Sequence, residues 1–241
     1  MSIWEYANPV KFMQTSGRFL PWVVAGAVLC MVTGLVWGYS TPPDYRQGAS
    51  VKIMYLHVPA AMMAINCWLM MLVASLIWIV RRHHVSALAA KAAAPIGATM
   101  TLIALVTGAA WGQPTWGTWG EWDPRLTSFL VLLLFYFGYI ALWEAVENPD
   151  SAADLTGVLC LVGSVFALLS RYAALFWNQG IHQGSSLSVA PGERMSEVYR
   201  YPLYLTMLGF FLTFVALLLI RTRTEIRIRR TAALQAREAR S

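Results

Sequence analysis

Six long runs of apolar residues dominate this chain of 241 residues. Each run approaches the length of about 20 helical residues that crosses the hydrocarbon core of a bilayer, which is about 30 Å thick. Only 12% of the residues are charged, against roughly 25% in an average globular domain, so an ordinary soluble enzyme is not favoured. The runs lie at residues 21–39, 58–80, 93–111, 126–144, 152–177 and 202–220. We therefore expect an all-α integral membrane protein that forms a single six-span membrane domain over residues 1–241.

The distribution of Lys and Arg predicts the orientation of these spans. Seven of the 18 cations follow Ile220, in a basic tail at residues 221–241. Further cations lie before the first span and between the second and third spans. Because short basic segments stay on the cytoplasmic side of a membrane, we expect the tail and both termini to be cytoplasmic. The net charge of +6 thus indicates a membrane-side tail, and no nucleic-acid partner is expected.

The three cysteines lie singly inside apolar runs, at Cys30, Cys67 and Cys160. Without a CxxC pair, the sequence supports neither disulfide exchange nor an iron–sulfur cluster, and it has no CxxCH for covalent haem attachment. We expect the three side chains to be small residues of the core.

The tryptophan-rich segment at residues 111–128 is the most unusual stretch of the chain, and the topology places it outside the cytoplasm. Its indoles are Trp111, Trp116, Trp119 and Trp122. Interspersed glycines and a proline predict a loop instead of a continuous helix, and they would let a flat ligand approach the backbone. Exposed indoles are costly unless something apolar covers them, which favours a planar apolar ligand or partner. The alternative is an aromatic belt that anchors the chain at the membrane surface.

Two polar residues follow the indoles. Asp123 precedes Pro124, and this pair is typical of a helix start, so Asp123 can fix the loop without contacting a ligand. Arg125 offers a guanidinium fork that suits a carboxylate of a ligand. The alternatives for Arg125 are a lipid phosphate or a pair with Asp123 or Glu121.

The four histidines fall on two sides of the predicted membrane. His83 and His84 follow two arginines on the cytoplasmic side, where we expect a solvated basic loop. His57 and His182 both lie at the outer ends of their spans. Two imidazoles beside an indole platform supply what haem requires, namely two axial nitrogen ligands and apolar faces. Zinc is less favoured, because no further Cys, His or carboxylate stands at ligand spacing around either histidine.

The segment WGQPTWGTWGEWDPRLTS at residues 111–128 resembles the WWD domain of the haem-handling proteins of cytochrome c maturation. With YLHVP at residues 55–59, HQGSS at residues 182–186 and six spans, the chain resembles the CcmC family over nearly its whole length. It departs from the family pattern at Gly120, where a second tryptophan is typical, and at Thr115, where methionine is common. These departures leave open which tryptophans contact a bound ring.

The resemblance implies a multi-pass protein of the bacterial inner membrane that binds haem at its periplasmic face. It implies haem b, held transiently and non-covalently, with His57 and His182 as axial ligands and a periplasmic loop from Trp111 to Asp123 that cups the porphyrin. The implied partners are the haem chaperone CcmE, which would receive the haem, the small membrane subunit CcmD and the ABC-type CcmA/CcmB complex. The resemblance therefore implies haem export or delivery for c-type cytochrome biogenesis, and not an enzyme.

Two other functions stay open on the sequence alone. A transmembrane haem permease of an ABC-type exporter would need ionisable or polar residues within several spans, and apart from Arg171 there are few, such as Asn66. A cytochrome b-like electron-transfer protein usually carries its histidines inside the spans, whereas His57 and His182 lie at span ends.

Overall fold

The computed structural model describes residues 8–120, 124–176 and 195–239, and within them every regular element is a helix. The helices are α1 (Pro9–Tyr39), the short 3-10 helix η2 (Ala49–Ile53), α2 (Met54–Arg81), α3 (His84–Trp116), α4 (Pro124–Ala145), α5 (Pro149–Phe176) and α6 (Glu197–Glu238).

Six of these helices are long and apolar enough to cross a membrane, with η2 and α2 forming one continuous candidate span. The predicted all-α, six-span fold is therefore confirmed. Several helices extend well beyond the apolar runs from which they were predicted. The 42 residues of α6 make a rod of about 63 Å at a rise of 1.5 Å per residue, roughly twice the thickness of a hydrocarbon core.

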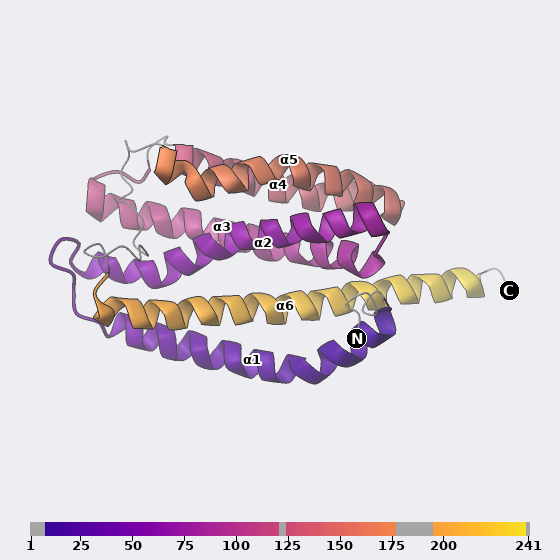
Figure 1. Cartoon of the computed structure of the whole chain (residues 1–241), viewed down its shortest axis with the longest axis horizontal. Coiled ribbons are helices and arrows are strands. Elements are labelled where there is room, and N and C mark those ends of the chain that lie inside the picture. The colour runs from indigo at the N-terminus through magenta and orange to yellow at the C-terminus, as the bar shows by residue number, and fades with distance from the viewer. Residues whose placement is uncertain (1–7, 121–123, 177–194, 240–241) are drawn as a thin grey trace.

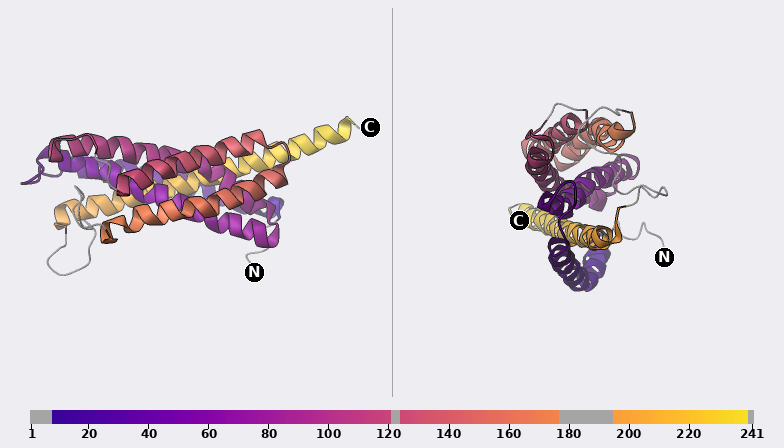
Figure 2. Two further views of the ribbon diagram at one scale, coloured as in Figure 1. Left: turned by 90° about the horizontal axis from the view of Figure 1, so that it is seen from above. Right: turned by 90° about the vertical axis from the view of Figure 1, so that its left-hand side faces the viewer.

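The helices lie side by side in an elongated bundle with α6 near its middle (Figure 1). On one side α6 contacts α2 and α3, which in turn contact α4 and α5. On its other side α6 carries α1, and α1 packs almost entirely against α6. The end-on view in Figure 2 shows α1 as the outermost helix, beyond α6.

The two ends of the bundle differ in what they hold. We call the end where α1 begins and α6 ends the terminal end, and the opposite one the loop end (Figure 1). The loop end holds the turn from α1 to α2, the last turns of α3 and the start of α6. Both termini of the described helical bundle thus lie at one end, as six spans require.

Glycines allow α1 and α6 to approach closely. A Cβ atom on Gly34 of α1 would lie 2.6 Å from Oγ1 and 2.7 Å from the backbone nitrogen of Thr206 in α6. A Cβ on Gly209 of α6 would lie 2.7 Å from the backbone nitrogen of Met31. Close packing of backbones through small residues is a main source of attraction between helices in lipid.

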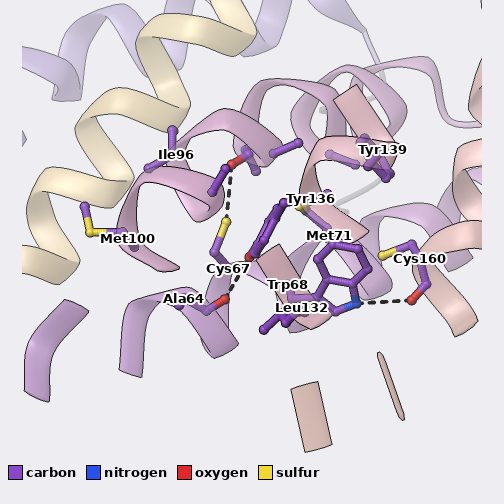
Figure 3. Packing of buried hydrophobic residues seen from close by; sticks show 14 of the residues in the cluster. Ala64, Cys67, Trp68, Met71, Ile96, Met100, Leu132, Tyr136, Tyr139 and Cys160 are labelled. Atoms are coloured by element: carbon purple, nitrogen blue, oxygen red, sulfur yellow. Dashed lines mark hydrogen bonds between the residues drawn. The ribbon is translucent and has the colours of Figure 1, made fainter. Parts of the chain in front are cut away.

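The core between α2, α3, α4 and α5 is built around Trp68 and Tyr136, both fully buried (Figure 3). The indole Nε1 of Trp68 donates to the carbonyl oxygen of Cys160 at 3.2 Å, and the hydroxyl of Tyr136 donates to the carbonyl oxygen of Ala64 at 2.7 Å. These bonds satisfy the polar tips of two large aromatic residues inside the bundle. Cys67 and Cys160 are buried free thiols, as expected of core residues, whereas Cys30 is only partly buried.

Polar contacts tie the helices together at the terminal end. Lys91 of α3 pairs with Glu225 of α6 at 2.9 Å. The expectation of a solvated basic loop at His83 and His84 holds for the exposure of His84, whose side chain is 56% exposed, but the residue already belongs to α3. His83 caps the start of α3, its Nδ1 accepting from the backbone N–H of Ser86, and the ring of His84 packs against a tryptophan of α2 at 5.2 Å between centroids. The chain passes from α2 to α3 through Arg82 and His83 alone, so the connection is shorter than expected.

We predict that Gly34→Ala weakens the packing of α1 on α6, because the added Cβ meets backbone and not only a movable side chain. Such overpacking should lower the free energy of unfolding by about 1–3 kcal/mol. Thermal unfolding in detergent, followed by tryptophan fluorescence, measures this. The matched control is Gly26→Ala on the same helix, whose Cβ would meet only the end of Leu212 at 3.4 Å. Equal midpoints for the two variants would contradict the prediction.

Candidate functional site

The predicted site residues fall at the loop end of the bundle as far as the structure describes them. The described ones are His57, Trp111, Trp116, Trp119 and Arg125. The other three, His182, Trp122 and Asp123, lie outside the described residues. The structure therefore describes one of the two predicted axial histidines, His57, together with three of the four indoles.

His57 lies in the first turns of α2 and turns its ring toward α3. Its Nδ1 atom is 3.0 Å from the carbonyl oxygen of Ala104 and 3.2 Å from Oγ1 of Thr107. A carbonyl oxygen can only accept a hydrogen bond, so Nδ1 carries the proton and donates it. The lone pair of a neutral ring in this tautomer resides on Nε2, which is the nitrogen that would coordinate a metal.

Gly108 makes room for this ring. A Cβ atom on Gly108 would lie only 2.9 Å from Cε1 of His57. Ala104, Thr107 and Gly108 together form what we call the imidazole seat. They occupy one face of α3, since residues three and four positions apart are neighbours on a helix.

Trp111 continues the same face of α3, one turn beyond Gly108. Its ring meets that of His57 edge to face, with centroids 5.7 Å apart and an interplanar angle of 75°. Its indole Nε1 donates to the side-chain oxygen of Gln47 at 2.9 Å. Trp111 is thus held from one side by α2 and from the other by the turn that follows α1.

A compact turn holds Gln47 in place. The carboxylate of Asp44 accepts hydrogen bonds from the backbone N–H groups of Arg46 and Gln47, at 2.8 and 2.9 Å. Asp44 and Gly48 exchange two further backbone bonds, and Gly48 adopts a φ of +59°, a backbone conformation that glycine favours. The side-chain amide of Gln47 is therefore presented to Trp111 by an ordered turn.

The tryptophan-rich segment differs from the predicted loop over residues 111–128. Helix α3 continues through Gly112 and Pro114 to Trp116, and α4 begins at Pro124, so the non-helical part is shorter than expected. A proline within a helix removes one backbone bond but need not end the helix. The end comes at Gly117, with a φ of +78° and its N–H bonded to the carbonyl of Gln113 at 3.0 Å.

The described indoles differ in exposure. The ring of Trp116 lies against Gly112, where a Cβ would be 3.2 Å from its Cε3 atom. Trp119 follows the end of α3, and 68% of its surface is exposed. Trp119 is therefore the described indole of this segment that has most surface to offer a ligand or a partner protein.

Arg125 and Arg171 lie on two helices that contact each other. Arg125 is in the first turn of α4, and its carbonyl accepts from the hydroxyl of Ser128 at 3.0 Å. That hydroxyl accepts in turn from Ser170 of α5 at 2.8 Å. Arg171, the next residue, is exposed near the end of α5 and is not in the core of the bundle.

Sequence reasoning found His57 and Trp111 but missed the residues that hold them. Gln47, Thr107 and Gly108 carry no motif of their own, and their partners lie far along the chain. One signal was present, because residues 104, 107, 108 and 111 follow helical spacing directly into the tryptophan-rich segment.

Comparisons with known proteins agree along the whole chain. The model of the family described as "CcmC: Heme exporter protein C" matches residues 2–237. A protein of that name from Paracoccus denitrificans is 82% identical over 241 residues, covering 100% of both chains. Its counterpart from Rhodobacter capsulatus is 73% identical over 239 residues and 99% of each chain. The one from Escherichia coli K12 is 42% identical over 223 residues, which are 92% of this chain and 89% of the relative.

We predict that Gln47→Leu releases the indole N–H of Trp111, because leucine cannot accept the bond that Gln47 Oε1 accepts. Losing a bond of about 1 kcal/mol should speed hydrogen exchange at this Nε1 roughly fivefold to tenfold. The indole resonance of Trp111 in the ¹⁵N-labelled protein, assigned with Trp111→Phe, reports the rate. Gln47→Glu keeps an acceptor oxygen and should retain the slow exchange. An unchanged rate in Gln47→Leu would show that the bond does not hold the ring.

Proposed function

The chain belongs to the CcmC family of haem exporter protein C, whose members handle haem in cytochrome c maturation. From this premise we propose that it binds haem at the periplasmic face of the bacterial inner membrane and presents it to the haem chaperone CcmE. The observation that carries the proposal is the placement of His57. It lies at the mouth of a span, with Nδ1 bonded into the imidazole seat and an indole against its ring.

The described residues fit haem as the cargo. A neutral imidazole with its lone pair on Nε2 is a suitable axial ligand. Trp111 and the exposed Trp119 offer apolar surface to a porphyrin, and an exposed indole at the end of a span gains from being covered. We assign the second axial position to His182, on the basis of the family resemblance. Two imidazoles saturate the iron of a bound haem b, and so suppress oxygen chemistry while the haem is held transiently and non-covalently.

The remaining predicted residues complete the proposed cup. We propose that Trp116 and Trp122 add to the indole surface offered to haem and that Asp123, which lies outside the described residues, has the role of fixing the loop. Arg125, in the first turn of α4, is the proposed partner of a haem propionate, because its guanidinium fork matches a carboxylate.

The orientation in this proposal rests on charge. The terminal end of the bundle carries the arginines of α6 from Arg221 onward and the cations near the starts of α1 and α3, whereas Arg200 lies at the other end of α6. Because basic segments stay in the cytoplasm, the terminal end is assigned to the cytoplasm and the loop end to the periplasm. The loop end is then the end that CcmE can reach. CcmD and the CcmA/CcmB complex are the proposed membrane partners.

Delivery of haem is favoured over a permease pathway through this chain by the composition of its interior. In the described bundle the fully buried polar residues are all serine or threonine, with no Asp, Glu, Lys, Arg or His among them. A polar pathway through a membrane usually shows ionisable residues facing the interior of the bundle. Arg171 does not supply one, since its side chain is exposed. Neither permease nor electron transfer explains an imidazole at the span mouth as directly as haem presentation does, and we propose no catalytic residue.

We predict that His57→Ala and His182→Ala each lose haem from the purified protein, because each removes an axial ligand. The absorption spectrum measures this: the six-coordinate, low-spin bands of the wild type should weaken or vanish in both variants. His83→Ala and His84→Ala are matched controls at the terminal end, far from the site, and should keep the spectrum. Unchanged haem content and spectrum in His57→Ala and His182→Ala would remove the axial assignment.

We further predict that Trp119→Ala and Trp122→Ala reduce the transfer of haem to CcmE severalfold. Trp119 is 68% exposed, so its loss should leave the fold intact. Trp22 is the matched control, since it is 78% exposed and lies in the terminal half of α1. Trp143 is less suitable as a control, because only 8% of its surface is exposed and Lys91 lies over its ring, so its loss would also disturb packing. Haem transferred per unit of protein is the measurement, and equal transfer by the Trp119 and Trp22 variants would reduce the segment to a membrane anchor.

A further inference from the structure

The imidazole seat holds His57 with two acceptors and not one. Nδ1 lies 3.0 Å from the carbonyl oxygen of Ala104 and 3.2 Å from the hydroxyl oxygen of Thr107. Both distances are within hydrogen-bonding range, so one N–H is shared between two oxygens. The second acceptor is a side chain, which can be changed without altering the backbone of α3.

The hydroxyl of Thr107 is already committed as a donor. It donates to the carbonyl oxygen of Ile103 at 2.6 Å, one turn earlier in α3. Its proton therefore points along the helix, and a lone pair of the same oxygen faces Nδ1 of His57. The carbonyl of Ala104 excludes the alternative in which Nδ1 is bare and accepts from Thr107, because two acceptor lone pairs would then face each other at 3.0 Å.

We propose that Thr107 is a positioning residue that, with the carbonyl of Ala104, holds the imidazole of His57 in its Nδ1–H tautomer before haem arrives. The inference has a second part, which rests on the proposed function. Once haem is bound, the same shared bond makes Nε2 a stronger donor to the iron. A hydrogen bond accepted from the outer nitrogen of a ligating histidine fixes the ring and raises its basicity as a ligand. Stronger donation stabilises the oxidised iron, so the seat lowers the reduction potential of the bound haem.

The chain offers variants that separate this role from a merely structural one. Thr107→Val keeps the β-branched shape but removes the acceptor oxygen, and Thr107→Ser restores an acceptor. Thr99 lies two turns earlier on α3 and makes the same kind of bond to its own helix, from its hydroxyl to the carbonyl of Pro95 at 2.8 Å. Thr99→Val is therefore the matched control for loss of a threonine hydroxyl from this helix.

The first measurement uses haem-free protein. The nitrogens of His57 are observed by NMR in protein labelled with ¹⁵N-histidine, at a pH where the histidines are neutral, with assignment from His57→Ala. The wild type should show protonated Nδ1. Thr107→Val should reduce the ratio of the Nδ1–H to the Nε2–H tautomer roughly fivefold, as expected for the loss of one of two acceptors. Thr107→Ser and Thr99→Val should match the wild type.

The second measurement is the reduction potential of haem bound to the purified protein. Thr107→Val should raise it, and Thr107→Ser and Thr99→Val should leave it at the wild-type value. If Thr107 only supported the fold, haem occupancy would fall while the haem that remained kept its potential. A potential that does not move in Thr107→Val, or a tautomer ratio that does not change, would overturn the inference.

The two measurements also separate this inference from the proposed function. If wild-type protein binds no haem, the proposed function fails, while the NMR measurement still judges the role of Thr107. If haem binds through His57 but neither the tautomer nor the potential responds to Thr107→Val, the proposed function stands and the role of Thr107 is wrong. If Thr107→Val binds no haem, the tautomer ratio alone decides.

Discussion

Lipid offers no hydrogen-bond partner to a polar group, and this constraint governs the whole molecule. It makes every span a helix, because only a helix satisfies its backbone within one segment. It also explains which polar side chains are found inside. The buried hydroxyls of Thr101, Thr156 and Thr206 each donate to a carbonyl one turn back in their own helix. Larger polar tips, such as the Trp68 indole, instead bond to the backbone of a neighbouring helix and so fix how two helices fit together.

The same need for hydrogen-bond partners explains the imidazole seat. His57 enters the bundle at a span mouth, and its Nδ1–H must find an acceptor. The acceptors come from α3, which is already bonded to itself, and Gly108 lets the ring approach closely enough to reach them. A bond that the membrane environment demands for stability therefore also decides which nitrogen of His57 carries the proton. The fold and the proposed chemistry share one interaction at this position.

Much of the fold could be predicted from the sequence because its cause is local. Runs of apolar residues predict the spans, and the structure contains six helices long and apolar enough to cross a membrane. The ends of the helices were harder to predict, because they depend on neighbours. Helix α6 continues to Glu238, well past the apolar run that ends at Ile220, and Glu225 within this extension pairs with Lys91 of α3. Helix α3 likewise continues through Pro114 and ends only at Gly117.

The candidate site, like the fold, could be predicted from the sequence only in part. Unusual residue types at unusual positions single out His57 and Trp111, and the structure brings their rings into contact. Gln47 and Thr107 are ordinary residues in ordinary surroundings. Their importance comes from contacts with partners 64 and 50 residues away in the chain, which no local pattern records. His182, Trp122 and Asp123 lie outside the described residues and rest on the sequence and the family alone.

The attachment of α1 has a consequence for biosynthesis. Among the described residues its only extensive contact is with α6, and the other described spans are synthesised after α1 and before α6. During synthesis α1 therefore has to remain in the bilayer without α6, its packing partner, until this last span has been made. Helix α1 can remain in lipid as an independent segment, because it is apolar and few of its residues are buried even in the finished bundle. Closure of the bundle by α6 onto α1 is then the last step of assembly.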